Sequence, residues 1–247
     1  MNTPILRIQQ RTNTSMKNRI PLNERLTTTV TFIDKCNTIA DIGSDHGYSS
    51  IYMAEEGIAQ KVIATDISAP SLAKTQKLVD ERNLSSVIDC RVGDGLKVIA
   101  PNEANSALIA GMGAELIASI IENSREVADK MDFLVLQPMN SAEPLRGALC
   151  NMGYEIIDEG ITLDNDKFYQ IIKCRYGNSK QLSRDELEIG TFVYNKKIPL
   201  CEEFIEHLIK KYEKILEYVG NNDPDRIFQI HRRLDGCRRV KEWLNVK

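Results

Sequence analysis

The sequence has few of the residues that mark a metal site, a disulfide framework or a membrane span. Its three histidines, His46, His207 and His231, do not form a metal-ligand spacing. Its six cysteines are scattered without a CxxC pair, which is typical of free thiols in a reducing compartment. No stretch approaches the ~20 apolar residues of a membrane helix, and the N-terminus lacks the apolar core of a signal peptide. We therefore expect a cytoplasmic protein with no bound metal and no membrane partner.

The chain is organised around residues 38–48, TIADIGSDHGY. An apolar run leads into a glycine turn, and the residues that follow can open a helix. In a doubly wound α/β sheet, such a strand, turn and helix place a nucleotide-like ligand at the carboxyl end of the first strand. Because Gly43 lacks a Cβ, the backbone can turn sharply and approach that ligand. We therefore predict a ligand site at this turn.

The turn lacks the GxGxxG fingerprint of a dinucleotide site, since Asp45 stands where the second glycine would be. A dinucleotide brings a pyrophosphate, which the carboxylates of Asp41 and Asp45 would repel. The same carboxylates suit a ligand with an ammonium or a sulfonium group. S-adenosylmethionine has both groups and carries no phosphate. The alternative interpretation is an ordinary strand-to-helix turn in which Asp45 is a solvated cap.

Two further acids stand at the ends of predicted strands. Asp66 lies near the end of residues 61–67, KVIATDI, and 19 residues beyond Gly47, a distance that suits hydrogen bonds from ribose hydroxyls. Asp94 follows the strand predicted for residues 87–92 and can bond the exocyclic amine of an adenine. A helix cap for Asp66 and a common turn for Asp94 are the alternatives. The ribose role of Asp66 is favoured because Asp66 and the glycine turn are two independent features that indicate the same ligand site.

Strand and helix patterns alternate along the chain and predict a Rossmann-like, mostly parallel α/β sheet. Two alternating apolar runs then predict an antiparallel hairpin at the edge of a seven-stranded mixed sheet, which differs from the parallel sheets of dehydrogenases. The predicted strands span residues 39–42, 61–67, 87–92, 106–110, 132–137, 154–159 and 167–175, with Gly160 and residues 164–166 separating the last two. The predicted helices span residues 22–33, 49–60, 70–83, 115–128 and 142–152.

The pattern changes near the C-terminus. Residues 199–219 and 225–246 predict two helices joined by a short turn, an antiparallel helical hairpin. The net charge is −3, yet residues 1–25 hold five basic residues against one acid, and the last 23 residues hold seven against three. Basic ends indicate a polyanionic partner, and a solvated helix face is the alternative. We predict that the outer face of the hairpin rests on phosphates through His231 and its RNA-binding arginines, Arg232, Arg233, Arg238 and Arg239.

Six segments, in this order and spacing, resemble the bacterial tRNA (adenine-22-N1)-methyltransferase family: IADIGSDHGY, ATDIS, RVGDGL, LIAGMGAELI, LVLQPM and DKFYQII. The resemblance runs from about Leu22 to the C-terminus and includes the coiled-coil hairpin. It implies a class I methyltransferase fold, S-adenosylmethionine as the donor and the D-arm side of tRNA as the substrate. The target adenine would be flipped out of its helix to accept the methyl group on N1. Residues 110–113, AGMG, lack the Asn/Asp-Pro-Pro-aromatic clamp of enzymes that methylate an exocyclic amine.

The resemblance assigns roles to the residues of these segments. The methionine end of the donor lies against Asp41, Gly43, Ser44, Asp45, His46 and Gly47. Asp66 binds the ribose, Ile67 stacks on the adenine of the donor, and Asp94 binds its amine between Gly93 and Gly95. The transferring methyl group faces Gly111, Met112 and Gly113, and the target base is held by Gln137, Pro138 and Asn140. Asp45 is the candidate for the carboxylate that stabilises the charge developing on the base.

We divide the chain into a flexible tail (residues 1–20), a methyltransferase domain (21–180) and a tRNA-binding helical hairpin (181–247). Arg25 lies off the apolar stripe of the first predicted helix, where it is free to contact RNA. We expect a monomer. The alternative function is methylation of another RNA position, a small molecule or a protein. A non-catalytic RNA-binding module is less well supported, because Asp41, Asp66 and Asp94 are all present.

Overall fold

A computed structural model describes residues 20–193, 198–219 and 223–246. The tail predicted for residues 1–20 lies outside these ranges except for Ile20. The Ile20 side chain is only 5% exposed and packs in the core, so the ordered fold begins before residue 21. All six cysteines are free thiols.

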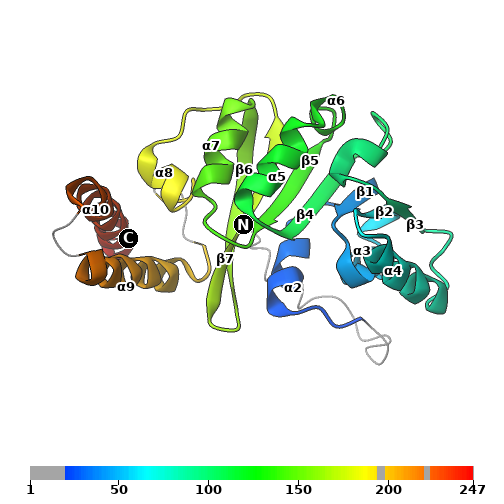
Figure 1. The fold of residues 1–247 in the computed structure, drawn as a ribbon, viewed down its shortest axis with the longest axis horizontal. Coiled ribbons are helices and arrows are strands. Elements are labelled where there is room, and N and C mark those ends of the chain that lie inside the picture. The colour runs from blue at the N-terminus through cyan, green and yellow to red at the C-terminus, as the bar shows by residue number, and fades with distance from the viewer. Residues whose placement is uncertain (1–19, 194–197, 220–222, 247) are drawn as a thin grey trace.

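The centre of the fold is a seven-stranded sheet with the order β3-β2-β1-β4-β5-β7-β6 (Figure 1). The pairs among β1 to β5 are parallel, and β7 runs antiparallel to both β5 and β6. The predicted mixed sheet with an antiparallel hairpin at one edge is thus confirmed. The strand order reverses beside β1 and β4, where doubly wound sheets bind their ligands. The strands are β1 (Cys36–Ile42), β2 (Ala59–Asp66), β3 (Ile88–Val92), β4 (Ser106–Met112), β5 (Phe133–Pro138), β6 (Tyr154–Asp164) and β7 (Lys167–Tyr176).

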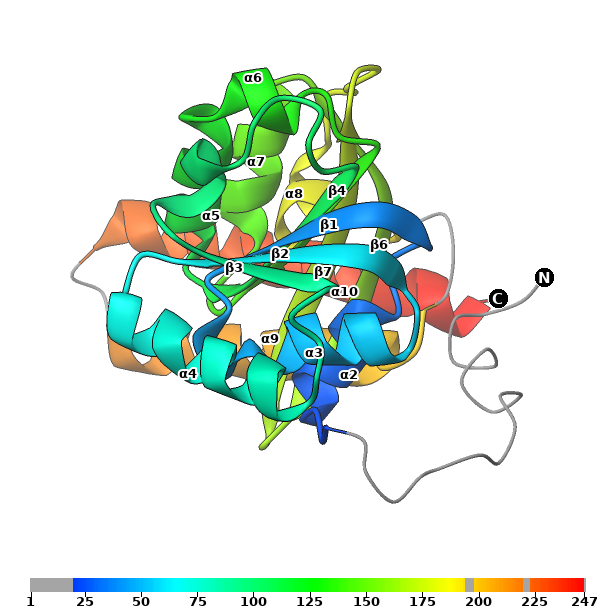
Figure 2. The same cartoon turned by 90° about the vertical axis from the view of Figure 1, so that its right-hand side faces the viewer.

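Helices cover both faces of this sheet (Figure 2). One face packs against an apolar cluster that includes Ile117 and Leu145, and the other against a cluster that includes Ile51 and Val79. The central strands are buried on both faces, which explains their continuous apolar runs. The first layer contains α5 (Ala114–Glu122), α6 (Arg125–Ala128), α7 (Glu143–Asn151) and the 3-10 turn η3 (Gly95–Val98), and the second contains α2 (Glu24–Val30), α3 (Tyr48–Glu55) and α4 (Ala69–Glu81).

The strand expected to stop at Gly160 continues through it. An added Cβ at Gly160 would lie 2.3 Å from Cζ of Phe32, so the aromatic ring occupies the space that a side chain would need. The glycine therefore permits close packing within β6 and does not end the strand. The chain turns later, at Asn165 and Asp166, which both have positive φ angles.

Three predicted helices are shorter than expected. The helix predicted for residues 22–33 spans only Glu24–Val30 as α2, and two others end or divide at a break in the backbone. The helix predicted for residues 49–60 ends as α3 at Glu55, because Gly57 adopts a φ of 59° and stops the helix. The helix predicted for residues 115–128 is divided into α5 and α6, since the backbone of Ser124 leaves helical geometry. Apolar periodicity continues across both breaks, so the pattern alone does not reveal them.

The C-terminal helices pack against the end of the β6–β7 hairpin. The predicted helical hairpin is present as α9 (Cys201–Val219) and α10 (Pro224–Val246). The short helix α8 (Arg184–Glu188), which was not predicted, precedes it and contacts both α7 and α10 (Figure 1). A third apolar cluster joins the helical hairpin to the sheet through Ile161 and Phe168. The helical hairpin therefore shares an apolar cluster with the end of the β6–β7 hairpin.

Candidate functional site

The glycine turn after β1 is held by residues from three other elements. Gly43 has a φ of 73°, and an added Cβ would lie 2.1 Å from Cε of Met112 at the end of β4. The N–H groups of Gly43 and Ser44 both donate to the carbonyl oxygen of Thr65. The hydroxyl of Thr75 in α4 donates to the carbonyl oxygen of Ser44 at 2.8 Å. The structure thus brings Gly43 and Met112 together, and a side chain at position 43 would have to displace the end of the Met112 side chain.

Asp41 lies in the buried floor of this turn. Only 4% of the residue is exposed, and its carboxylate accepts a hydrogen bond from the hydroxyl of Ser50 at 2.5 Å. Burial raises the pKa of Asp41 to about 6, although the hydrogen bonds from Ser50 act in the opposite direction. A cation nearby would favour the ionised carboxylate. Asp41 therefore ties β1 to α3 and supplies negative potential beneath the turn.

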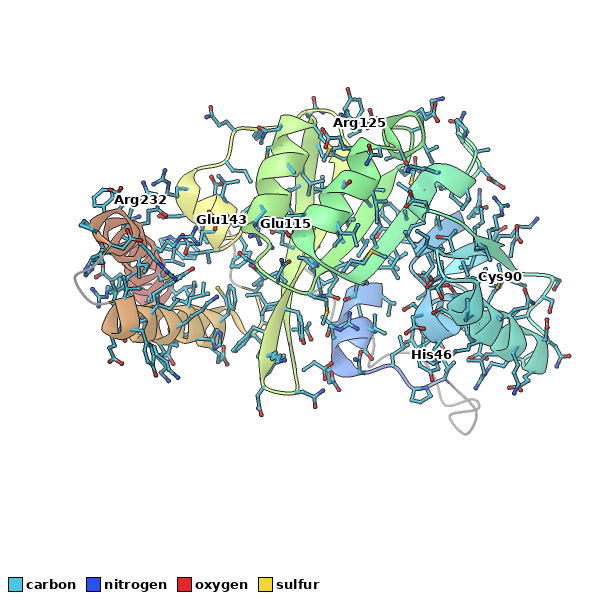
Figure 3. All side chains as sticks on the ribbon, in the orientation of Figure 1. His46, Cys90, Glu115, Arg125, Glu143 and Arg232 are labelled. Carbon is cyan, nitrogen blue, oxygen red and sulfur yellow. The ribbon has the colours of Figure 1, made fainter. Side chains whose placement is uncertain are left out.

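Asp45 and His46 project from the 3-10 turn η2 (Asp45–Gly47) toward solvent. Their side chains are 64% and 44% exposed, and Nε2 of His46 lies 3.7 Å from Oδ1 of Asp45. The His46 ring stacks on Tyr48 with centroids 5.6 Å apart. Figure 3 shows His46 on the side of the molecule that carries α3 and α4. His46 is neither buried nor in the core, and its contact with Tyr48 ties the turn to the start of α3.

The carboxyl ends of β2 and β3 present an acid beside exposed apolar side chains. Oδ1 of Asp66 accepts a hydrogen bond from the N–H of Ser68 at 2.7 Å. Ile67 is 73% exposed, and Val92, the strand partner of Asp66, is 55% exposed. Exposed apolar residues at adjacent strand ends can cover the face of a flat ring. The structure thus adds Val92, which sequence reasoning missed, to the predicted stacking residue Ile67.

Asp94 lies in the loop after β3. Nζ of Lys97 lies 2.5 Å from Oδ2 of Asp94, and both side chains are more than half exposed. Gly93 has no room for a Cβ, which would lie 2.0 Å from Cγ1 of Val98. The loop is therefore tightly packed against Val98 at Gly93. The Asp94 carboxylate is accessible to solvent and forms an ion pair with Lys97.

Gln137 is fully buried at the end of β5. Its amide oxygen accepts hydrogen bonds from the Gly111 N–H at 3.1 Å and from the Arg25 guanidinium, and its amide nitrogen donates to the Pro138 carbonyl at 2.7 Å. Protein atoms surround the amide of Gln137 in this structure, so it is not open to a target base, and its role in holding that base stays a prediction. Gln137 instead fixes Arg25, which also lies over the Tyr169 ring at 5.8 Å.

Asn140 and Glu115 form a polar pair beside the loop after β4. Oδ1 of Asn140 accepts a hydrogen bond from the Ala114 N–H at 2.8 Å and so caps the start of α5. Nδ2 of Asn140 donates to Oε2 of Glu115 at 3.2 Å. Both side chains lie about 4 Å from the position that a Cβ on Gly113 would take. Glu115 was not assigned a role from the sequence, although its place directly after a glycine turn at a strand end was a signal.

The sequence suggested that the four hairpin arginines share one outer face. In the structure they do not. Arg233 is turned toward α7 and α8, where its guanidinium lies 2.8 Å from Glu143 and 3.6 Å from Glu188. Arg239 pairs with Asp185 of α8 at 2.9 Å. Two contacts keep the remaining arginines on the hairpin itself: Arg238 pairs with Glu213 at 3.2 Å, and Arg232 lies over the Phe228 ring at 5.8 Å. Figure 3 shows Glu143 and Arg232 on the two parts that face each other here.

The site has the chemistry of a donor pocket for S-adenosylmethionine. The hydroxyl oxygen of Ser44 is buried and lacks a hydrogen-bond partner within the described part of the chain, so a ligand at the turn would satisfy it. Carboxylates at Asp41 and Asp45 suit positive groups, and the exposed Ile67 suits the adenine ring. No group of three His, Cys, Asp or Glu side chains in residues 20–193, 198–219 and 223–246 is arranged to hold a metal ion. Across those ranges, no helix has the length and apolar character needed to span a membrane.

Comparisons with known proteins agree with this geometry. Residues 22–172 match the family model described as "Methyltransferase domain". The tRNA (adenine(22)-N(1))-methyltransferase of Bacillus subtilis is 35% identical over 234 residues, which cover 90% of this chain and 98% of the relative. The crystal structure of the B. subtilis m1A22 tRNA methyltransferase TrmK superposes with a TM-score of 0.80 at 28% identity, covering 90% of this chain and 99% of that one.

A second solved structure is similar over the same length. A putative tRNA (m1A22) methyltransferase of Streptococcus pneumoniae, in complex with S-adenosyl-L-methionine, has a TM-score of 0.80 at 26% identity and covers 90% of this chain and 100% of that one. Fold, site and family model together define a class I methyltransferase. Within that class, the chain belongs to the tRNA (adenine(22)-N(1))-methyltransferase family.

Proposed function

We propose that this protein methylates N1 of adenine 22 in tRNA with S-adenosylmethionine as the donor. The observation that carries the proposal is the match to the B. subtilis enzyme over 90% of the chain, which includes the helical hairpin as well as the donor site. Because the proposed substrate is tRNA, we also propose that the reaction takes place in the cytoplasm. We also propose that the chain acts as a monomer.

The donor pocket uses residues from three strand ends. When bound, S-adenosylmethionine supplies a methyl group on a positively charged sulfur, and the N1 lone pair takes that methyl as the carbon–sulfur electron pair returns to sulfur, so the positive charge passes to the adenine. Asp41 and Asp45 attract the positive end of the donor, and Asp66 accepts hydrogen bonds from its ribose. Ile67 and Asp94 hold its adenine ring. Positioning by these groups supplies much of the rate, because N1 needs no base before attack.

Arg25 is proposed to bind a phosphate next to the flipped nucleotide. Its guanidinium is held by Gln137 and lies near the Gly111 end of β4. The positive charge of Arg25 would repel the positive charge that forms on the methylated base. An anionic group of the tRNA is therefore the better partner for Arg25. A phosphate can bind the planar guanidinium through two hydrogen bonds. Its negative charge would also compensate the positive charge of Arg25, which is partly buried.

The helical hairpin is proposed to bind the tRNA backbone through Arg232 and Arg238. Arg238 is 53% exposed, and its partner Glu213 is also at the surface, so a phosphate can replace that weak pair. Arg233 and Arg239 contribute less, because they already hold the hairpin against α7 and α8.

The test is methyl transfer from labelled S-adenosylmethionine to unmodified tRNA carrying adenine at position 22, with a tRNA carrying guanine there as the control. Nucleosides are then resolved by mass spectrometry. We expect N1-methyladenosine in the first sample only. Label in both samples would mean another target in tRNA. Absence of label from both, with donor binding intact in calorimetry, would point to a small-molecule or protein substrate.

A further inference from the structure

Glu115 is an exposed carboxylate that the fold holds beside the end of β4. It is the second residue of α5, and Oε2 lies 3.9 Å from the position that a Cβ on Gly113 would take. The Asn140 amide, which caps α5 through its oxygen, donates to that same carboxylate oxygen at 3.2 Å. Glu115 is therefore oriented by a residue from the loop after β5, and it remains exposed.

This position is next to the donor turn. Met112, three residues before Glu115, places its methyl group against Gly43, so the segment 111–113 lies between the donor turn and Glu115. Arg25 approaches the same segment at Gly111, where its Nη1 lies 3.7 Å from the position of an added Cβ. One cation and one anion thus border the end of β4. In Figure 3 Glu115 lies at the start of α5, away from His46 and the α3–α4 layer.

Adenine has the groups that a carboxylate in this place would recognise. N1 and the exocyclic N6 belong to one amidine, so methylation at N1 spreads a positive charge over both nitrogens. A carboxylate that accepts a hydrogen bond from N6–H therefore binds more strongly as the methyl group is transferred. Guanine presents the acceptor O6 at the same edge, which a carboxylate repels.

We propose that Glu115 binds the N6 amino group of the target adenine, selects adenine over guanine and stabilises the charge on the methylated base. The inference rests on the proposed function. Asn140 is its positioning residue. Asp45 was the carboxylate first considered for this role. It belongs to the donor turn, where the positive charge of the donor lies before the methyl group is transferred. Gln137 is buried and Arg25 is a cation, so Glu115 is the group at this strand end with the required sign and access.

The first test compares E115Q with E122Q. Glu122 is exposed at the other end of the same helix, so E122Q makes the same change of charge away from the site. With tRNA carrying adenine 22, we expect kcat of E115Q to fall roughly 10- to 100-fold, because one charge-stabilising group in an accessible site is lost. E122Q should stay within about twofold of the unchanged protein. E115D, which keeps the charge, should retain more activity than E115Q.

The second test measures binding without the donor. The affinities for tRNAs carrying adenine or guanine at position 22 are compared by fluorescence titration. The unchanged protein should bind the tRNA with adenine 22 more tightly than the tRNA with guanine 22. In E115Q the ratio of the two affinities should be smaller, because a glutamine amide can donate a hydrogen bond to O6 of guanine. N140D keeps an oxygen to cap α5 but replaces the donor to Glu115 with a second carboxylate. We expect N140D to lower kcat while Tm stays within about 2 °C, as the cap is retained.

Equal kcat values for E115Q and E122Q, or an unaltered adenine-to-guanine preference in E115Q, would overturn the role of Glu115 and leave the proposed function standing. Failure of the unchanged protein to methylate adenine 22 would instead overturn the proposed function, and the role of Glu115 with it. Measuring the unchanged protein first separates the two results.

Discussion

Single residues at the donor turn show how burial and close contact limit what each position tolerates. Asp41 has one hydroxyl partner in an otherwise buried environment, and Gly43 has the methyl group of Met112 where a side chain would be. Both residues are at the same turn, yet one is constrained by charge and the other by space. These constraints lead to separate predictions.

The carboxyl of Asp41 should make stability depend on pH. Burial raises its pKa from 3.8 to about 6 in the folded protein, so the folded state binds this proton more tightly than the unfolded chain does. Ionised Asp41 therefore destabilises the fold above pH 6, and the cost disappears below about pH 4. In urea unfolding, the stability of D41N relative to the unchanged protein should rise by up to about 3 kcal/mol between pH 4 and pH 7. A difference that stays constant over this range would contradict the buried carboxyl.

Gly43 should tolerate alanine less well than Gly57 does. Both glycines have positive φ angles, but a Cβ at Gly57 meets nothing within 4 Å, whereas at Gly43 it meets Met112 at 2.1 Å. We expect G57A to cost about 1 kcal/mol for backbone strain and G43A about 1–2 kcal/mol, because the flexible end of the Met112 side chain must also move aside. Thermal unfolding measures both, and calorimetry with S-adenosylmethionine should show weaker binding for G43A alone.

The cause can be isolated with a second substitution. If the clash with Met112 is responsible, adding M112A to G43A should recover part of the lost stability. Similar losses in G43A and G57A would mean that strain alone accounts for both.

At the scale of elements, ion pairs orient the helical hairpin against the methyltransferase fold. Arg233 of α10 reaches Glu143 of α7 and Glu188 of α8, and Glu188 also accepts a hydrogen bond from the Tyr212 hydroxyl. Only 8% of Glu188 is exposed, and burial raises its pKa. The guanidinium of Arg233 therefore pairs with Glu143 and, together with the Tyr212 hydroxyl, also compensates the charge of the buried Glu188.

Loss of Arg233 should accordingly destabilise the protein more than loss of Arg238. R233M leaves Glu188 buried without its cation, which should cost about 2–3 kcal/mol. R238M breaks a surface pair with Glu213 and should cost less than about 1 kcal/mol. Urea unfolding at pH 7 compares the two variants. Binding of tRNA should respond in the reverse order, with the salt dependence of affinity reduced more by R238M. Equal stability losses would argue against the buried pair.

At the scale of the whole molecule, the boundary drawn after residue 180 cuts through a buried network. Arg146, which is fully buried, pairs with Glu159 at 2.7 Å and donates to the carbonyl of Leu187. Glu159 also accepts hydrogen bonds from the N–H and the hydroxyl of Thr191. The segment that contains α8 is therefore joined to the methyltransferase domain by buried hydrogen bonds and to the helical hairpin by Ile189, Phe192 and Val193, although the sequence assigned it to the hairpin alone.

A chain that ends at residue 180 should consequently be much less stable than one that ends at residue 193. The shorter chain loses both Leu187 and Thr191 and so removes hydrogen bonds from a buried ion pair, a change that costs about 1–3 kcal/mol for each polar group left unsatisfied. The longer chain keeps this network, although it loses the helical hairpin that covers Ile189, Phe192 and Val193. We expect the chain of 193 residues to retain donor binding in calorimetry and the shorter one to unfold at a lower temperature. Equal melting temperatures would support the original boundary.

Much of the fold could be predicted from local patterns. Apolar alternation and turns indicated all seven strands and the C-terminal helical hairpin, because periodicity reflects which face of an element is buried. The acids at strand ends could be placed at one edge because parallel strands share a direction. Gly160 was misread, since glycine in a strand and glycine in a turn look alike until the ring of Phe32 is seen against it.

The sequence by itself determined the order of strands and helices, the donor turn and the family. Only the tertiary structure decided which polar side chains reach a ligand and which serve the protein. Gln137 and Arg25 are 112 positions apart and Asn140 and Glu115 are 25 apart, so no local pattern relates them. Side-chain direction at such positions depends on packing between elements, which turns Gln137 inward, Arg233 toward Glu188, and Glu115 toward the end of β4.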